Sequence, residues 1–111
     1  MKRILFRGKR FNGEWVYGFY TELKGVPKII NEYGVFDVLR DTVGQLIHCD
    51  DNLEIFVGDI VQNTISGNIF VVKFNHSWKG FEPFISYEGY KAYKVIGNIY
   101  DNRELLKGVE R

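Results

Sequence analysis

The sequence has little of what several large classes of protein require. Its single cysteine, Cys49, cannot form a disulfide within the chain, and there are only two prolines, one methionine and one alanine. No apolar stretch approaches the ~18 residues that a membrane-spanning helix needs. No N-terminal apolar segment resembles a signal peptide. We therefore expect a protein of the reducing cytoplasm that has no membrane partner.

Charge is present in ordinary amount but is unevenly distributed. The formal net charge of +1 gives no overall attraction to nucleic acid or to a membrane surface. Five basic side chains nevertheless lie in the first ten positions, and the rest of the chain is mildly acidic. These five are Lys2, Arg3, Arg7, Lys9 and Arg10.

Aromatic residues and glycines are abundant. Nine Phe, seven Tyr, two Trp and twelve Gly in 111 residues predict strands and turns rather than helices. A chain of this length is sufficient for one domain with one core. Eighteen rings exceed what a short barrel holds, so we expect some at a subunit interface of a homo-oligomer.

The N-terminal half is predicted to form hairpins. Asn12-Gly13 separates two strand-like runs within residues 2–23, because that dipeptide supplies positive φ angles for a tight turn. Trp15, Tyr17 and Phe19 are expected to line one face of the second strand, where Trp15 and Tyr17 supply core area. A second pair of strands is predicted in residues 26–39 around a turn at 32–34. A short strand follows at 42–47, where Gly44 indicates either a bulge or a close approach of another main chain.

The C-terminal half has regular turn signals. Gly58-Asp59 is predicted to turn into a strand at 60–64, and Ser66-Gly67 to reverse the chain into a strand at 68–75. Further expected elements are strands near 81–87 and 93–99 and a short helix after Asp101 or Asn102, ended by Gly108.

Together these patterns predict a mainly β protein. We interpret residues 1–111 as a single domain, with a β-hairpin region at 1–50 and a small SH3-like barrel at 55–101. A short C-terminal helix completes the expected fold.

Three stretches resemble the YopX family of bacteriophage and prophage proteins. They are "FRGKRFNGEWVYGFY" at 6–20, "TVGQ" at 42–45 with "GDIV" at 58–61, and "VIGNIYDNRELL" at 95–106. The resemblance implies a predominantly β phage or prophage protein with no known activity to inherit. The sequence departs from the family pattern at residues 46–57, where the segment is shorter than in the family and lacks the usual glycine-rich loop.

No residue set predicts catalysis or a cofactor. The segment "HCDD" at 48–51 has ligand-type side chains, but adjacent positions seldom reach one ion and no second ligand pair follows. Cys49 and His76 lack an orienting third group, so we interpret them as a small buried thiol and a loop histidine. Asp59 is expected to bond nearby main-chain N–H groups in its turn. We therefore predict no enzyme, no metal and no cofactor.

The basic hairpin is the candidate binding surface. Its cations stand beside aromatic faces on which unpaired bases can stack, as at single-strand binding sites. The alternative is that the charges solubilise an edge strand while the rings belong to a core or an interface. The candidate nucleic-acid site comprises Lys2, Arg3, Arg7, Lys9, Arg10, Trp15 and Tyr17.

Two functions follow from these observations. The leading hypothesis is an uncharacterised phage or prophage accessory protein that acts without catalysis as an oligomeric binding or assembly module, with a host protein among its possible partners. The alternative is a nucleic-acid-binding accessory protein that uses the basic hairpin.

Overall fold

The computed structural model describes residues 6–84 and 89–108. This part of the chain contains eleven strands and two 3₁₀ helices, so the prediction of a mainly β protein is confirmed. The chain divides into two compact units, Met1–Leu46 and Ile47–Arg111. That the two units belong to one domain stays a prediction.

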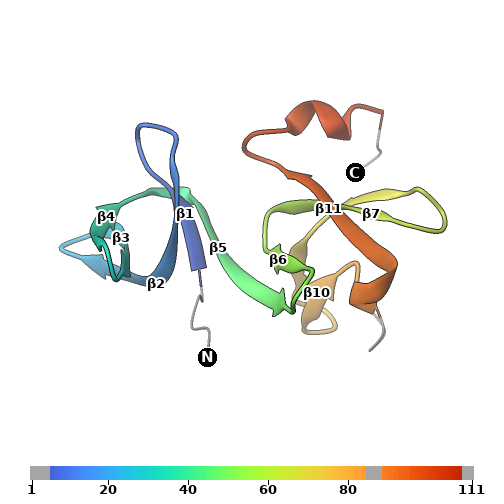
Figure 1. Cartoon of the computed structure of the whole chain (residues 1–111), viewed down its shortest axis with the longest axis horizontal. Helices are drawn as coiled ribbons and strands as arrows, with labels where there is room; N and C mark the ends of the chain where they lie inside the picture. Colours follow the sequence, from blue (N-terminus) through green and yellow to red (C-terminus); the bar gives the residue numbers. More distant parts are fainter. Residues whose placement is uncertain (1–5, 85–88, 109–111) are drawn as a thin grey trace. The chain divides into compact units, whose positions relative to one another are not determined.

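The first unit is an antiparallel sheet (Figure 1). Its strand order is β4-β3-β2-β1-β5-β6, and β5 continues into the second unit, where β6 lies. The strands are β1 (Phe6–Lys9), β2 (Trp15–Leu23), β3 (Val26–Asn31), β4 (Gly34–Asp37), β5 (Leu39–Cys49) and β6 (Glu54–Phe56). The strand expected at 42–47 is therefore longer than predicted, and β4 is an outer strand of the sheet.

The turns of the first unit follow from its glycines. Gly13 has φ +94° in the predicted β1–β2 turn, which is wider than a two-residue turn because the Arg10 N–H donates to the Glu14 carbonyl at 2.7 Å. The predicted β3–β4 turn is confirmed. The β2–β3 turn was not predicted. Lys24 and Gly25 both have positive φ there, as a two-residue hairpin of type I′ requires.

A bulge interrupts the pairing of β1 with β5. Arg7 pairs with Gly44, but Lys9 pairs with Leu39, so extra residues of β5 stand opposite Gly8. The Lys9 N–H donates to the Thr42 hydroxyl at 2.8 Å, which replaces a lost ladder hydrogen bond. The bulge predicted from Gly44 is therefore confirmed, immediately before that residue.

The second unit contains two small antiparallel sheets (Figure 1). One has the order β11-β7-β8 and the other is the β9–β10 hairpin. Their strands are β7 (Asp59–Asn63), β8 (Ile69–Val71), β9 (Lys73–Asn75), β10 (Gly80–Glu82) and β11 (Tyr93–Asn98). The 3₁₀ helices are η1 (Gly89–Ala92) and η2 (Arg103–Leu106).

The Gly58-Asp59 turn organises the core of the second unit. Gly58 has φ +98°, and the Phe56 N–H donates to the Asp59 carboxylate at 2.7 Å. This bond confirms the expectation that Asp59 is a turn residue that bonds a nearby main-chain N–H group. The Asp59 residue is buried, with 2% of its surface exposed. The adjoining core cluster of this unit is Ile55, Val61, Val72 and Phe84.

Two expectations need correction, and a third is not confirmed. The single strand expected at 68–75 is two strands, because Val72 interrupts it: β8 pairs with β7, whereas β9 pairs with β10. The SH3-like barrel expected at 55–101 is not confirmed, because no closed barrel is found among the strands of the described residues. The C-terminal helix is a 3₁₀ helix that ends before Gly108, whose φ is +82°.

Candidate functional site: an aromatic groove in the first unit

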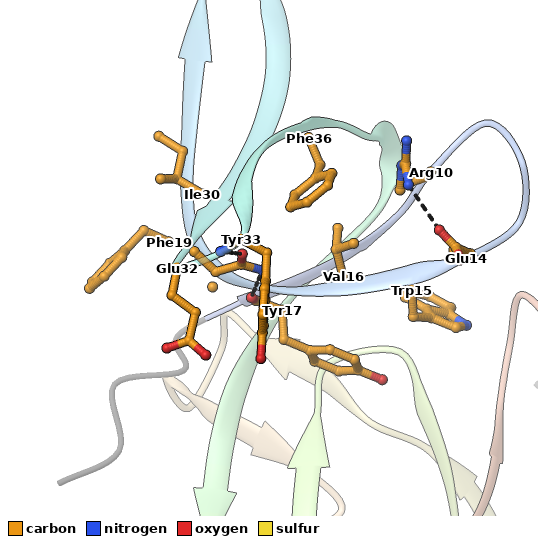
Figure 2. Close-up of a pocket in the computed structure, with 12 residues that line it drawn as sticks. Arg10, Glu14, Trp15, Val16, Tyr17, Phe19, Ile30, Glu32, Tyr33 and Phe36 are labelled. Atoms are coloured by element: carbon orange, nitrogen blue, oxygen red, sulfur yellow. Dashed lines mark hydrogen bonds and ion pairs between the residues drawn. The ribbon is translucent and has the colours of Figure 1, made fainter.

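An open groove of about 840 Å³ lies on the first unit (Figure 2). Strand β2 supplies one side, and the end of β3 with the β3–β4 turn supplies the other. Five aromatic side chains are the common feature of its lining. They are Trp15, Tyr17, Phe19, Tyr33 and Phe36.

Several of these rings are left open to solvent. Tyr17 is 39% exposed, Phe19 is 49% exposed and Tyr33 is 81% exposed. Figure 2 shows Tyr17 and Tyr33 on the same side of the ribbon, with Glu32 beside them. Tyr17, which the sequence analysis placed among the core residues, is therefore a surface residue. The groove offers ring faces to a binding partner.

Gly18 allows the two sides of the groove to approach. Residues Trp15–Gly18 of β2 pair with β1, whereas residues Phe19–Leu23 pair with β3. At this change of partner a Cβ on Gly18 would lie 2.2 Å from the Ile30 carbonyl oxygen, so only glycine fits. The Asn31 side-chain amide donates to the Tyr17 carbonyl at 2.8 Å and fixes the end of β3 there.

The charges of the groove are mostly neutralised within it. The Arg10 guanidinium lies 2.9 Å from a Glu14 carboxylate oxygen and also stands 5.1 Å from the centre of the Phe36 ring. The Tyr33 hydroxyl hydrogen bonds to Glu32, which raises the pKa of Tyr33. The lining therefore contains two carboxylates and one guanidinium, a balance that does not favour a polyanion.

The structure places two residues of the candidate nucleic-acid site, Arg7 and Lys9, beside the Trp15 ring. Arg10 instead pairs with Glu14. The Arg7 guanidinium lies 4.7 Å and the Lys9 ammonium 5.7 Å from the Trp15 ring centre, both within cation–π range. Arg7 is only 6% exposed, so its charge is held against protein. Lys2 and Arg3 lie outside the described residues.

The other chemistry-bearing side chains are dispersed. The His48 ring stacks on Tyr90 at 4.3 Å, and its Nε2 lies 2.8 Å from an Asp50 carboxylate oxygen. Cys49 is exposed rather than buried, and its thiol lies 3.8 Å from Glu54. His76 contacts the Phe74 ring. The described residues contain no group of three or more His, Cys, Asp or Glu side chains that could hold a metal ion.

No family model, curated protein or solved structure matches this chain. The groove must therefore be interpreted from its own geometry. Among the residues that the structure describes, no helix is both long and apolar enough to cross a membrane.

Sequence reasoning found one side of the groove and missed the other. Trp15, Tyr17 and Phe19 were expected on one face of a strand, and all three line the groove. Tyr33 and Phe36 were given no role. An available signal was the tyrosine at the centre of a predicted turn, a position where a large ring has no core to enter.

Proposed function

We propose that this chain is a small, non-enzymatic accessory protein of a phage or prophage, a member of the YopX family, that acts as a binding and assembly module in the host cytoplasm. The observation that carries the binding role is the groove with its three exposed rings, Tyr17, Phe19 and Tyr33. Contiguous exposed aromatic surface is typical of sites that bind other proteins.

The finer fold that we propose for residues 55–101 is an SH3-like barrel. The order β11-β7-β8, the interruption at Val72 between β8 and β9, and the 3₁₀ helix η1 directly before β11 all support it. The first unit has a strand order similar to that of the second. Its last strand, β5, pairs with its first strand, β1, and β2 pairs with β1 along one half and with β3 along the other. Small barrels of this kind carry binding surfaces of many types.

The binding role can be tested by comparing groove variants in a host-cell pull-down. The double variant Tyr17→Ser, Phe19→Ser removes exposed rings and leaves the core intact. Ile65→Ser is the matched control, because Ile65 is 88% exposed in the second unit and does not line the groove. A partner identified by mass spectrometry should bind the wild type and the control as purified protein, but not the groove variant. Equal capture by all three would contradict the proposal.

We expect homo-oligomers as part of the assembly role. Phe74 (39% exposed) and Trp78 (44% exposed) offer further apolar surface in the second unit. Light scattering over a concentration series should show self-association that Phe74→Ser weakens. A monomer at every concentration up to high micromolar would remove this part of the proposal.

Nucleic-acid binding is the second candidate function. The observation that favours it is the position of Lys9 beside the Trp15 ring. Lys9 would bind a phosphate, and a base would stack on the nearby Trp15 ring. Binding to oligo-dT should then weaken with added salt and with Lys9→Ala and Arg10→Ala. An absence of binding at low salt would end this candidate.

A further inference from the structure

Strand β4 has one side of its main chain facing away from the sheet. The β3–β4 turn has two residues, so Asn31 and Gly34 form its closing pair. Antiparallel pairs alternate between hydrogen-bonded and non-hydrogen-bonded types. Counted from the hydrogen-bonded closing pair, every second residue of β4 is therefore bonded to β3. The bond from the Val38 N–H to the Pro27 carbonyl, at 3.1 Å, follows this pattern. The main-chain groups of Val35 and Asp37 therefore face outward.

No other strand covers this edge within the described residues. β4 is the last strand of the sheet, and within the described part of the chain the Val35 and Asp37 main-chain groups form no hydrogen bond with another segment. Each of the two residues offers one N–H and one C=O. This spacing of donors and acceptors is what an additional antiparallel strand satisfies.

A hollow of about 420 Å³ lies beside the edge. β4 bounds it with Val35, Phe36 and Asp37, and the tip of the β1–β2 hairpin bounds it with a second group of residues. That second group is Arg10, Phe11 and Asn12. The hollow adjoins the aromatic groove, because Arg10 and Phe36 line both.

We propose that the outer edge of β4 receives an extended segment of a partner protein as an added strand, an inference that rests on the proposed binding function. Main-chain hydrogen bonds from Val35 and Asp37 would hold the segment, as in other cases of strand addition. The hairpin tip stands on the far side of the hollow. The space therefore suits one extended chain rather than the sheet edge of a second copy.

Charge and exposure define the chemistry of the segment. Arg10 is paired with Glu14, and Asp37 is paired with Lys28, so the hollow presents no uncompensated charge. Phe11 is 74% exposed and Val35 is 56% exposed. The segment should accordingly carry uncharged, apolar side chains at alternate positions, where they cover these residues.

The test uses random peptides displayed on phage, selected on the full wild-type protein. The selected peptides are then titrated against Val35→Pro, which removes one outward N–H and leaves the β3–β4 ladder in place. Binding should weaken at least about tenfold, because a peptide carbonyl loses its donor while buried. Val35→Thr keeps the N–H and should bind nearly as the wild type does.

Hydrogen exchange gives an independent measurement on the wild-type protein. The amides of Val35 and Asp37 should exchange fast in the free protein and slowly with peptide bound. This result does not depend on whether Val35→Pro folds. Failure to enrich any peptide, equal binding to Val35→Pro and Val35→Thr, or unchanged exchange would overturn the proposal. Protection that appears with protein concentration alone would overturn it in favour of a second copy. Loss of binding in Tyr17→Ser, Phe19→Ser but not in Val35→Pro would leave the groove function standing without strand addition.

Discussion

Replacing Gly18 with alanine should destabilise the first unit more than any comparable glycine substitution outside a turn. The new Cβ would lie 2.2 Å from the Ile30 carbonyl oxygen, about 1.2 Å inside the 3.4 Å at which ordinary contact begins. The obstacle is the main chain of β3, which cannot rotate away. Gly18 does not have a positive φ, so the penalty is steric rather than conformational.

The magnitude follows from what must move. Overpacking at a closely packed position costs about 1–3 kcal/mol. Separation of β2 from β3 also endangers the Asn31–Tyr17 hydrogen bond, which contributes about 1 kcal/mol. Loss of glycine's freedom in the unfolded chain offsets about 0.4–1 kcal/mol. The net decrease in the free energy of unfolding should be about 1–3.5 kcal/mol.

Gly80→Ala is the matched control. Its Cβ would lie 2.4 Å from the Trp78 ring, a nominal overlap similar to that at Gly18. Trp78 is 44% exposed, however, so the indole can move into solvent at the cost of an altered rotamer, about 0.5–1.5 kcal/mol. The loss of glycine's freedom in the unfolded chain offsets part of this cost as well. The free energy of unfolding should therefore change by no more than about 1 kcal/mol.

Urea denaturation followed by far-UV circular dichroism measures both variants. Equal losses for Gly18→Ala and Gly80→Ala, or a loss below about 1 kcal/mol for Gly18→Ala, would refute the reasoning that a main-chain obstacle decides the cost.

Three further predictions concern single side chains. Asp59→Ala should lower the free energy of unfolding by about 1.5–3 kcal/mol in urea titrations, and Asp59→Asn by less, because the buried Phe56 N–H loses its acceptor only in the first. Lys24→Gly should raise thermal stability slightly, since relief of the αL cost at φ 54°, about 1–2 kcal/mol, exceeds the about 0.4–1 kcal/mol lost to glycine's freedom in the unfolded chain. A lower melting temperature would contradict this. The pKa of Asp50 is lowered mainly by a hydrogen bond from the Asn52 N–H and, secondly, by one from His48. The stabilising contribution of Asp50 is therefore present above its unfolded-state pKa and is lost as the pH falls through its folded-state pKa. Asp50→Asn should therefore flatten the acid end of the stability profile, and an unchanged profile would count against it.

The predicted groove residues show where sequence reasoning succeeds and where it stops. Alternation placed Trp15, Tyr17 and Phe19 on one face of β2, because successive side chains of a strand point to opposite sides. It did not tell whether that face is buried. Tyr17 was assigned to the core and is 39% exposed, since burial depends on which other strand covers the face.

Local signals determined the turns and the class of fold. Gly13, Gly58 and Gly67 were expected at reversals of the chain and have positive φ, because a residue without a Cβ adopts that conformation at little cost. The carboxylate of Asp59 was expected to bond a nearby N–H, and it does. Such interactions span only a few residues, so the sequence contains all of their determinants.

Tertiary structure alone decided the features from which function is proposed. The change of partner at Gly18, the interruption at Val72 and the outer position of β4 all depend on which strands pair across long stretches of chain. Pairing of this kind is set by the packing of whole strand faces rather than by neighbouring residues. The groove and the open edge of β4 exist because of it, and no short motif in the sequence encodes them.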